Sequence, residues 1–171
     1  MAKRKKVFSE KVMKIRVGLG FDVHQLQEGR DFWLGGIKLP TTKGATGHSD
    51  ADVLIHAICD ALLGAANLRD IGFHYSNKDA QWKDKDSKFF LADVTKKLLE
   101  KGWTIENVDC TIVLENPKIN RHIDEMKKVL APLMNLTEED ISIKATTNET
   151  MGYVGREEGV NAMAVALIKK D

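Results

Sequence analysis

Two kinds of apolar pattern alternate along this chain, and that alternation limits the folds it can adopt. Between residues 50 and 66, apolar residues recur at the spacing of one helix face: Val53, Leu54, Ala57, Ile58, Ala61 and Leu62. Shorter apolar runs, bounded by turn residues, are typical of strands. We therefore expect the α/β (α+β) class, with a small mixed β-sheet covered by helices on one face.

The same patterns give the order of the expected elements. Strands are expected over residues 15–21, 108–114, 141–147 and 160–168, and a hairpin over residues 32–39. Helices are expected over residues 50–66, 87–102 and 119–133. Ser87 could cap the second helix, and Thr137 to Asp140 form a T-x-x-D capping pattern. Residues 70–87 show little periodicity, so we expect a functional or flexible loop there.

Length and composition describe a globular protein without strong charge. The 171 residues suit one domain, which we expect over residues 14–171 after an N-terminal extension at 1–13. The formal net charge of +1 favours neither nucleic acid nor a membrane surface, and no apolar run is long enough to span a bilayer. Cys59 and Cys110 lie in apolar runs and are expected to be buried, reduced thiols, which favours a cytoplasmic location.

The first candidate site combines a strand and the following helix. Side chains alternate along a strand, so Asp22 and His24 share one face. On the helix, Asp52, His56 and Asp60 are spaced four apart and share another face. If strand and helix pack together, Asp22, His24 and His56 suit zinc with an open fourth position, and Asp60 could orient the His56 ring. The alternative is an incidental D-x-H pair and a satisfied core histidine.

Two further groups have both a functional and a structural interpretation. At the expected start of the helix, His48 and Ser49 could hold an anionic oxygen, or Ser49 and Asp50 could only cap the helix. The K-A-T-T-N-E segment from Lys144 to Glu149 suits a phosphate and a divalent cation. Its alternative is a polar turn, because Thr and Asn are common loop residues.

Three shorter segments leave similar alternatives open. Arg156 could bind phosphate or pair with a neighbouring acid. Pro117-Lys118 could bind a nucleotide or begin a helix, and Asp70-Ile71-Gly72 could receive hydroxyl groups or end the first helical region. The chain contains no Walker loop, no G-x-G-x-x-G fingerprint and no G-x-S-x-G elbow, which excludes several common enzyme classes.

Several of these segments together resemble one enzyme family. Five segments occur in the order expected of 2-C-methyl-D-erythritol 2,4-cyclodiphosphate synthases, and the chain resembles that family in them: GFDVH, HSDADVLIHAICDALLGAANLRDIG, ENPK, KATTNE and GREEG. The resemblance runs from Ile15 to Lys169 and implies a homotrimer of α/β subunits with active sites at subunit interfaces. It implies a phosphorus–oxygen lyase of the non-mevalonate isoprenoid pathway. Its substrate, 4-diphosphocytidyl-2-C-methyl-D-erythritol 2-phosphate, would be attacked by its own 2-phosphate, giving the cyclic diphosphate and CMP.

The resemblance also implies roles for individual residues. The implied metal ligands are Asp22, His24 and His56 for one Zn²⁺ per active site, and Glu149 for Mg²⁺ or Mn²⁺ bound with the substrate diphosphate. His48 and Thr147 are the implied catalytic residues, and Asp52 and Asp60 are expected to support the zinc ligands. The implied substrate-binding residues are Asp22, His24, His48, Ser49, Asp70, Ile71, Gly72, Tyr75, Asp79, Pro117, Lys118, Thr146, Thr147, Glu149, Tyr153 and Arg156.

The chain departs from the family pattern in three places. Residues 75–79, Y-S-N-K-D, stand where the family often has F-P-D-T-D, and Leu114-Glu115-Asn116 replaces a commoner alanine-rich segment. Tyr153 replaces a frequent phenylalanine. Tyr153 and Arg156 fall at positions that the resemblance associates with a cavity on the trimer axis, able to hold an isoprenoid diphosphate.

Two other functions are compatible with the same residues. A zinc-dependent phosphohydrolase would use the same ligands but release ring-opened products. A non-catalytic trimer that senses an isoprenoid diphosphate would not need the three metal ligands, which this chain retains. Metal content and the structure of the products distinguish the three hypotheses.

Overall fold

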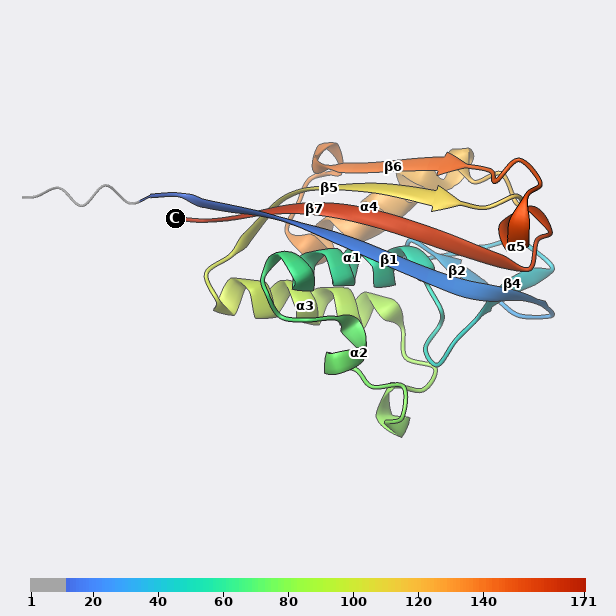
Figure 1. Cartoon of the computed structure of the whole chain (residues 1–171), viewed down its shortest axis with the longest axis horizontal. Coiled ribbons are helices and arrows are strands. Elements are labelled where there is room, and N and C mark those ends of the chain that lie inside the picture. The colour runs from blue at the N-terminus through green and yellow to red at the C-terminus, as the bar shows by residue number, and fades with distance from the viewer. Residues whose placement is uncertain (1–11) are drawn as a thin grey trace, which may run out of the picture.

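The computed structural model describes residues 12–171, and its centre is a five-stranded mixed sheet (Figure 1). In spatial order the strands are β4 (Lys43–Thr46), β1 (Lys14–Glu28), β7 (Gly159–Lys170), β5 (Thr104–Val113) and β6 (Ile141–Thr146). Neighbouring strands are antiparallel except for β5 and β6, which are parallel. A separate hairpin pairs β2 (Phe32–Leu34) with β3 (Ile37–Leu39). The expected mixed α/β class is confirmed.

Helices pack against this sheet and against one another. The α-helices are α1 (Val53–Ala65), α2 (Ile71–His74), α3 (Ser87–Glu100), α4 (Ile123–Met134) and α5 (Gly152–Gly155). The short 3-10 helices are η1 (Ala80–Trp82), η2 (Asn120–His122) and η3 (Glu138–Asp140). Helix α1 packs along β1 and β7, and α3 packs against α1 (Figure 1). This arrangement places residues of β1 and α1 next to each other.

Two glycines in β1 allow α1 to approach the strand closely. A Cβ atom at Gly20 would lie 1.9 Å from the backbone oxygen of Ala57, and one at Gly18 would lie 2.0 Å from that of Ala61. Only glycine therefore fits at these two positions while α1 stays where it is. Because Asp22 and His24 follow on the same face of β1, the close packing brings both side chains toward the first turns of α1.

The other face of the sheet is apolar and uncovered. Val17, Leu19 and Phe21 alternate with the glycines of β1 and are 62%, 70% and 52% exposed. The same face of β1 and β7 carries four more exposed apolar residues: Ile15, Val23, Met163 and Val165. Monomeric proteins rarely expose so many contiguous apolar side chains. The helices thus cover one face of the sheet, as expected, and leave a second apolar face open.

The first strand is longer than its apolar run indicates. It was expected to end at residue 21, but β1 continues to Glu28 because β7 pairs with it as far as Gln25 and β4 pairs with it from Gln25 to Glu28. Asp22 and His24 consequently lie inside a paired strand. Pairing with β7 along one edge fixes their backbone more firmly than a strand exit would.

Four helix starts differ from the expected ones. Helix α1 begins at Val53 with Asp52 as its N-cap, so neither Ser49 nor Asp50 caps it. Asp86 caps α3, and Ser87 is the first residue inside that helix. The expected loop at residues 70–87 contains α2 and η1, each begun by an Asp cap that the weak periodicity did not reveal.

Two expectations concern the chain as a whole. Most of the expected N-terminal extension lies outside the described residues. Val12 and Met13, its last two residues, precede β1 and are exposed. Among residues 12–171, no helix has both the length and the apolar character needed to cross a bilayer.

Candidate active site

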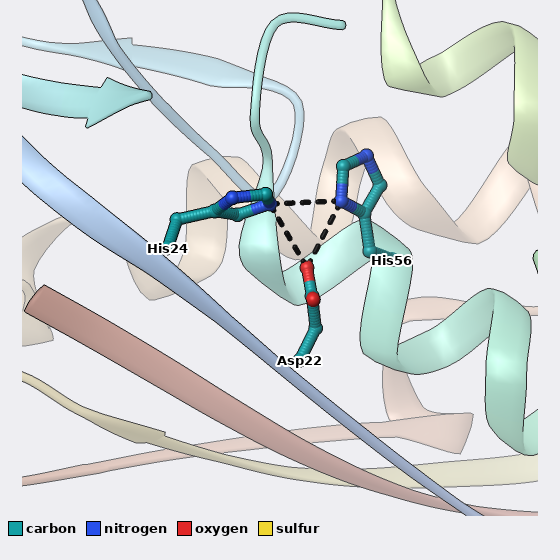
Figure 2. A group of neighbouring side chains, drawn as sticks. All are labelled: Asp22, His24 and His56. Atoms are coloured by element: carbon teal, nitrogen blue, oxygen red, sulfur yellow. Dashed lines mark hydrogen bonds and ion pairs between the residues drawn. The ribbon is translucent and has the colours of Figure 1, made fainter. Parts of the chain in front are cut away.

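Asp22, His24 and His56 meet where β1 packs against α1 (Figure 2). Asp22 Oδ2 lies 3.0 Å from His24 Nε2 and 3.0 Å from His56 Nδ1, and the two ring nitrogens are 3.1 Å apart. The three side chains are 26%, 16% and 12% exposed. The packing that the sequence left open is therefore present, and all three atoms converge on one point.

The geometry of this triad fits a divalent metal ion. Each ring nitrogen carries one in-plane proton or lone pair, so hydrogen bonds cannot satisfy all three atom pairs at once. In a tetrahedral site with metal–ligand bonds of 2.0–2.2 Å, ligand atoms lie about 3.3 Å apart. The observed separations of 3.0–3.1 Å are close to that value. The donor set and its spacing could hold such an ion and leave a position for another ligand.

Charge is concentrated at the same point. Burial alone would raise the pKa of Asp22, but hydrogen bonds from His24 and His56 and their charges outweigh it and hold that pKa well below its usual range. Burial would lower the pKa of His56, but the hydrogen bond and charge of Asp22, together with the charges of Asp52 and Asp50, raise it. A carboxylate that stays ionised is a suitable metal ligand at neutral pH.

A pocket of about 360 Å³ opens beside the triad. His48, Ser49, Ile71, Gly72 and Tyr75 line it together with His24 and His56, so the structure groups most residues expected at one end of the substrate. One glycine, one more polar residue and two more aromatic residues complete the lining: Gly47, Asn77, Trp82 and Phe90. The pocket therefore has a polar end at the metal triad and an apolar wall beyond it.

The loop after α2 is fixed to this pocket. The Tyr75 hydroxyl donates to Asp93 Oδ2 at 2.6 Å, and the Tyr75 ring packs on Phe90 with centroids 4.7 Å apart. A ring N–H of His48 donates to the Asp79 carbonyl oxygen at 3.1 Å. Because the loop has these tertiary contacts, Tyr75 lines the pocket without the proline that the family pattern often has. Asp79 does not line the pocket and is connected to it through His48.

Asp60 was expected to orient the His56 ring and Asp52 to support the zinc ligands, but among residues 12–171 both carboxylates bind backbone amides instead. Within residues 12–171, the Asp52 carboxylate accepts hydrogen bonds from the amides of Gly35, Gly36 and Ile55, and burial raises its pKa. Asp60 accepts the Ile71 amide at 2.7 Å, while the Asp70 side chain caps α2. Asp52 joins α1 to the β2–β3 turn, and Asp60 joins α1 to α2, so both act on the site through the backbone.

Several of the other expected substrate residues form a second group near the end of β6. Pro117, Lys118, Thr146 and Thr147 line a separate hollow of about 180 Å³. The Thr147 hydroxyl donates to Glu149 Oε1 at 2.9 Å. Neither Thr147 nor Glu149 lines the pocket beside the triad. Each half of the predicted site is thus assembled, but one chain does not join the two halves in one pocket.

The sheet register explains this separation. Val23 of β1 lies opposite Asn161 of β7, Asn161 opposite Val113 of β5, and Val113 opposite Thr146 of β6. The two groups therefore lie at the same level of the sheet, three strand spacings of about 4.8 Å apart, or roughly 14 Å. A distance fixed by three paired strands cannot close by side-chain movement.

Tyr153 and Arg156 lie near α5, away from both pockets. Arg156 forms a bidentate pair with Glu158, with both N–O distances 2.9 Å, which is the ion-pair alternative considered for this residue. Asn161 Nδ2 donates to the Tyr153 hydroxyl at 2.9 Å. A role for these two residues in binding an isoprenoid diphosphate stays a prediction.

Sequence reasoning missed several residues that support the site. Ser87 was considered only as a helix cap, yet its Oγ lies 2.9 Å from His56 Nε2. Trp82 and Phe90 form the pocket wall. Glu115 accepts the amides on either side of Glu149, from Asn148 and Thr150, at 2.9 and 3.2 Å. The spacing of Ser87 and Phe90, three apart on one helix, was an available signal for part of this wall.

Comparison with known proteins gives consistent matches over nearly the whole chain. A 2-C-methyl-D-erythritol 2,4-cyclodiphosphate synthase from Cytophaga hutchinsonii is 66% identical over 158 residues, which cover 92% of this chain and 99% of that relative. Among solved structures, the bifunctional IspDF from Campylobacter jejuni has a TM-score of 0.90 and 36% identity, covering 94% of this chain and 43% of that longer chain. A CDP complex of IspF from Plasmodium falciparum has a TM-score of 0.81 and 29% identity, covering 92% and 97%.

The family model agrees with these relatives. It is described as the YgbB family and matches residues 15–169, which include α1, all but one residue each of β1 and β7, and both halves of the site. The metal triad, the pocket beside it and the second hollow all lie within the matched range. This chain therefore belongs to the YgbB family.

Proposed function

We propose that this chain catalyses the 2-C-methyl-D-erythritol 2,4-cyclodiphosphate synthase reaction, a phosphorus–oxygen lyase step of the non-mevalonate isoprenoid pathway. The substrate is 4-diphosphocytidyl-2-C-methyl-D-erythritol 2-phosphate, and the products are the cyclic diphosphate and CMP. The observation that carries the proposal is the convergence of Asp22, His24 and His56 beside a pocket, in a chain 66% identical to a synthase of that name.

The reaction needs positioning more than acid–base chemistry. An oxygen of the substrate's 2-phosphate forms a bond to the β-phosphorus. The bond from that phosphorus to the bridging oxygen breaks, and the bridging oxygen leaves with CMP and the electron pair. Both reacting groups belong to one substrate, so holding its ends together supplies much of the rate enhancement. The protein's task is to fold the substrate and stabilise charge on its diphosphate.

The residues divide this task between them. Asp22, His24 and His56 would hold Zn²⁺, and Glu149 would help hold Mg²⁺ or Mn²⁺ with the substrate diphosphate. When bound, these ions supply positive charge that stabilises the diphosphate oxygens during transfer. Hydrogen-bond donors at His48 and Thr147 would orient the diphosphate and stabilise its transition state.

The pocket wall would decide the product. Ser49 would contact the same diphosphate, while Ile71 and Gly72 line the part of the pocket suited to the methylerythritol phosphate. The rings of Tyr75, Trp82 and Phe90 pack on one another with centroids 4.7–5.9 Å apart, and they would exclude water from the far wall. Water reaching the β-phosphorus would give an open-chain product, so an apolar wall favours cyclisation over hydrolysis.

We infer that the complete site is shared between subunits of a homotrimer. Two observations support this: the halves of the site are roughly 14 Å apart across three paired strands, and the uncovered sheet face is apolar. Packing that face against copies of the chain would bury Val17, Leu19 and Phe21. A neighbour's hollow, lined by Pro117 and Thr147, would then complete the pocket beside the triad and hold the cytidine end.

Mixing two inactive variants tests the shared site. His56→Ala removes a metal ligand from one half, and Thr147→Ala removes a hydroxyl from the other. Co-refolded at equal amounts, the two variants should recover about a quarter of wild-type CMP release, because random assembly joins two intact halves in that fraction of interfaces. A site built within one chain would give no recovery, since every chain would carry one defect. Each variant refolded alone serves as the control.

The proposal extends to the setting of the enzyme. Residues 14–171 would form its single catalytic domain. Cys59 and Cys110 are both free and buried, as expected of a protein from the reducing cytoplasm, where we place it. Tyr153 and Arg156 would line a cavity on the trimer axis that holds an isoprenoid diphosphate.

A further inference from the structure

The His56 ring is held from both sides. Its Nδ1 points toward Asp22 and His24, as Figure 2 shows, while Nε2 on the opposite edge lies 2.9 Å from Ser87 Oγ and 3.2 Å from Ser49 Oγ. Ser87 is fully buried at the start of α3, 31 residues further along the chain. Tertiary packing has therefore placed a hydroxyl behind the ring of an expected metal ligand.

Ser87 is itself attached to a carboxylate. Its backbone N–H donates to Asp50 Oδ2 at 2.9 Å, and its hydroxyl is hydrogen-bonded to Asp50 Oδ1. Asp50 lies in the loop before α1, so these contacts tie together the loop, α1 and α3. The result is a continuous series of polar groups from Asp50 through Ser87 to His56.

The chemistry of these groups assigns the protons. An ionised carboxylate accepts hydrogen bonds only, so the Ser87 hydroxyl must donate its single proton to Asp50. The same oxygen then accepts, and its partner Nε2 of His56 must carry the proton. Without a metal ion, Nδ1 can also carry a proton and donate it to Asp22, and metal binding displaces that proton. The ring that remains is neutral, with its proton on Nε2 and its lone pair on Nδ1, which faces Asp22 and His24. That tautomer is the one able to bind a metal ion within the triad.

We propose that Ser87 and Asp50 are positioning residues that hold His56 in its metal-binding tautomer and orientation. This inference rests on the metal site of the proposed function, but it concerns residues outside the ligand set. The Ser87 hydroxyl is not needed to dock α3, because the backbone amide of the same residue already binds Asp50. Its function is therefore separable from the fold.

Zinc affinity of the metal-free protein tests the proposal. Ser87→Ala removes only the hydroxyl and keeps the amide. We expect it to weaken Zn²⁺ binding by about 10–100-fold, the usual effect of losing such a partner of a ligating histidine. Asp50→Asn keeps an oxygen acceptor but loses the charge, so it should cause a smaller loss in the same direction. Affinities are measured by competition with a chromophoric chelator.

A second buried hydroxyl on α3 provides the matched control. The Thr95 hydroxyl donates a hydrogen bond to the Leu91 carbonyl oxygen at 2.9 Å and makes no hydrogen bond to His56. Thr95→Val removes this hydroxyl at nearly constant volume and should leave Zn²⁺ affinity unchanged. Denaturant unfolding of all variants separates loss of stability from loss of metal affinity, and Asp50→Asn keeps the test decisive if Ser87→Ala does not fold.

Nitrogen NMR of the metal-free protein reads the tautomer directly. In the wild type, Nε2 of His56 should be protonated and in slow exchange with solvent, whether or not Nδ1 also donates to Asp22. In Ser87→Ala the share of rings with a protonated Nε2 should fall. Unchanged zinc affinity together with an unchanged tautomer in the folded Ser87→Ala variant would overturn the proposal. Wild-type protein that binds no Zn²⁺ would contradict the proposed metal site, while the tautomer measurement would still decide the role of Ser87.

Discussion

Gly20 sets how closely α1 approaches β1, so replacing it should displace the helix that carries His56. A Cβ atom at this position would lie 1.9 Å from the Ala57 oxygen and 2.6 Å from the Ala61 nitrogen, both backbone atoms, whereas real Cβ atoms stay at least 3.0 Å away. In Gly20→Ala the helix must therefore retreat by roughly 1 Å, and overpacking of this kind typically costs about 1–3 kcal/mol of unfolding free energy.

The displacement should reach the site as well as the core. His56 is adjacent to Ala57, so moving this turn by roughly 1 Å separates Nδ1 from its two partners, and misplacement on this scale can lower turnover by about 10²-fold. Denaturant unfolding measures the loss of stability, and CMP release together with Zn²⁺ titration measures the damage to the site. Gly64→Ala is the matched control: nothing lies within 4 Å of its Cβ, and a helical Gly-to-Ala change is expected to stabilise by about 0.5–1 kcal/mol. Wild-type stability and zinc affinity in Gly20→Ala would refute the reasoning.

Two further predictions concern the second half of the site and the pocket loop. Glu115→Ala removes the acceptor of two amides beside Glu149 and should lower kcat for CMP release at saturating Mg²⁺. Glu115→Gln keeps an acceptor and should retain most of the wild-type kcat. Equal kcat values for the two variants would contradict this prediction. Burial opposes ionisation of Asp93, but hydrogen bonds from Tyr75 and Lys97 outweigh it and lower the Asp93 pKa below the usual 3.8. The ionised carboxylate therefore stabilises the fold above that pH, and this contribution is lost as the pH falls further. The urea midpoints of wild type and Asp93→Asn should therefore differ at pH 7 and converge below about pH 4, and a constant difference would contradict the assignment.

Local patterns predicted the metal triad because its three residues lie on regular elements. Two-residue spacing on a strand placed Asp22 beside His24, and the first helix was correctly assigned around His56. Whether strand and helix packed together was an assumption. Gly18 and Gly20 permit this packing, because a Cβ atom at either position would clash with α1. That clash exists only in the folded chain, so in the sequence the two glycines only interrupt an apolar run.

The misassigned residues depend on contacts between segments far apart in the chain. Ser49, Asp50 and Asp52 all lie within four residues of the start of α1. Asp52 caps the helix because the β2–β3 turn presents the amides of Gly35 and Gly36 to the same carboxylate. Asp60 accepts the Ile71 amide, and it is Ser87 that contacts Nε2 of His56. Periodicity along one segment carries no information about partners 11 to 31 residues away.

Phosphorus NMR of 4-diphosphocytidyl-2-C-methyl-D-erythritol 2-phosphate, incubated with this protein and Mg²⁺, tests the central claim most directly. The proposed function predicts CMP and a cyclic diphosphate in equal amounts, and neither product after a chelator removes the metal ions. His56→Ala should behave as the chelated wild type does. An open-chain bisphosphate with CMP would show a hydrolase, and unchanged substrate with zinc-loaded protein would show a binding protein; either result would contradict the proposed cyclisation.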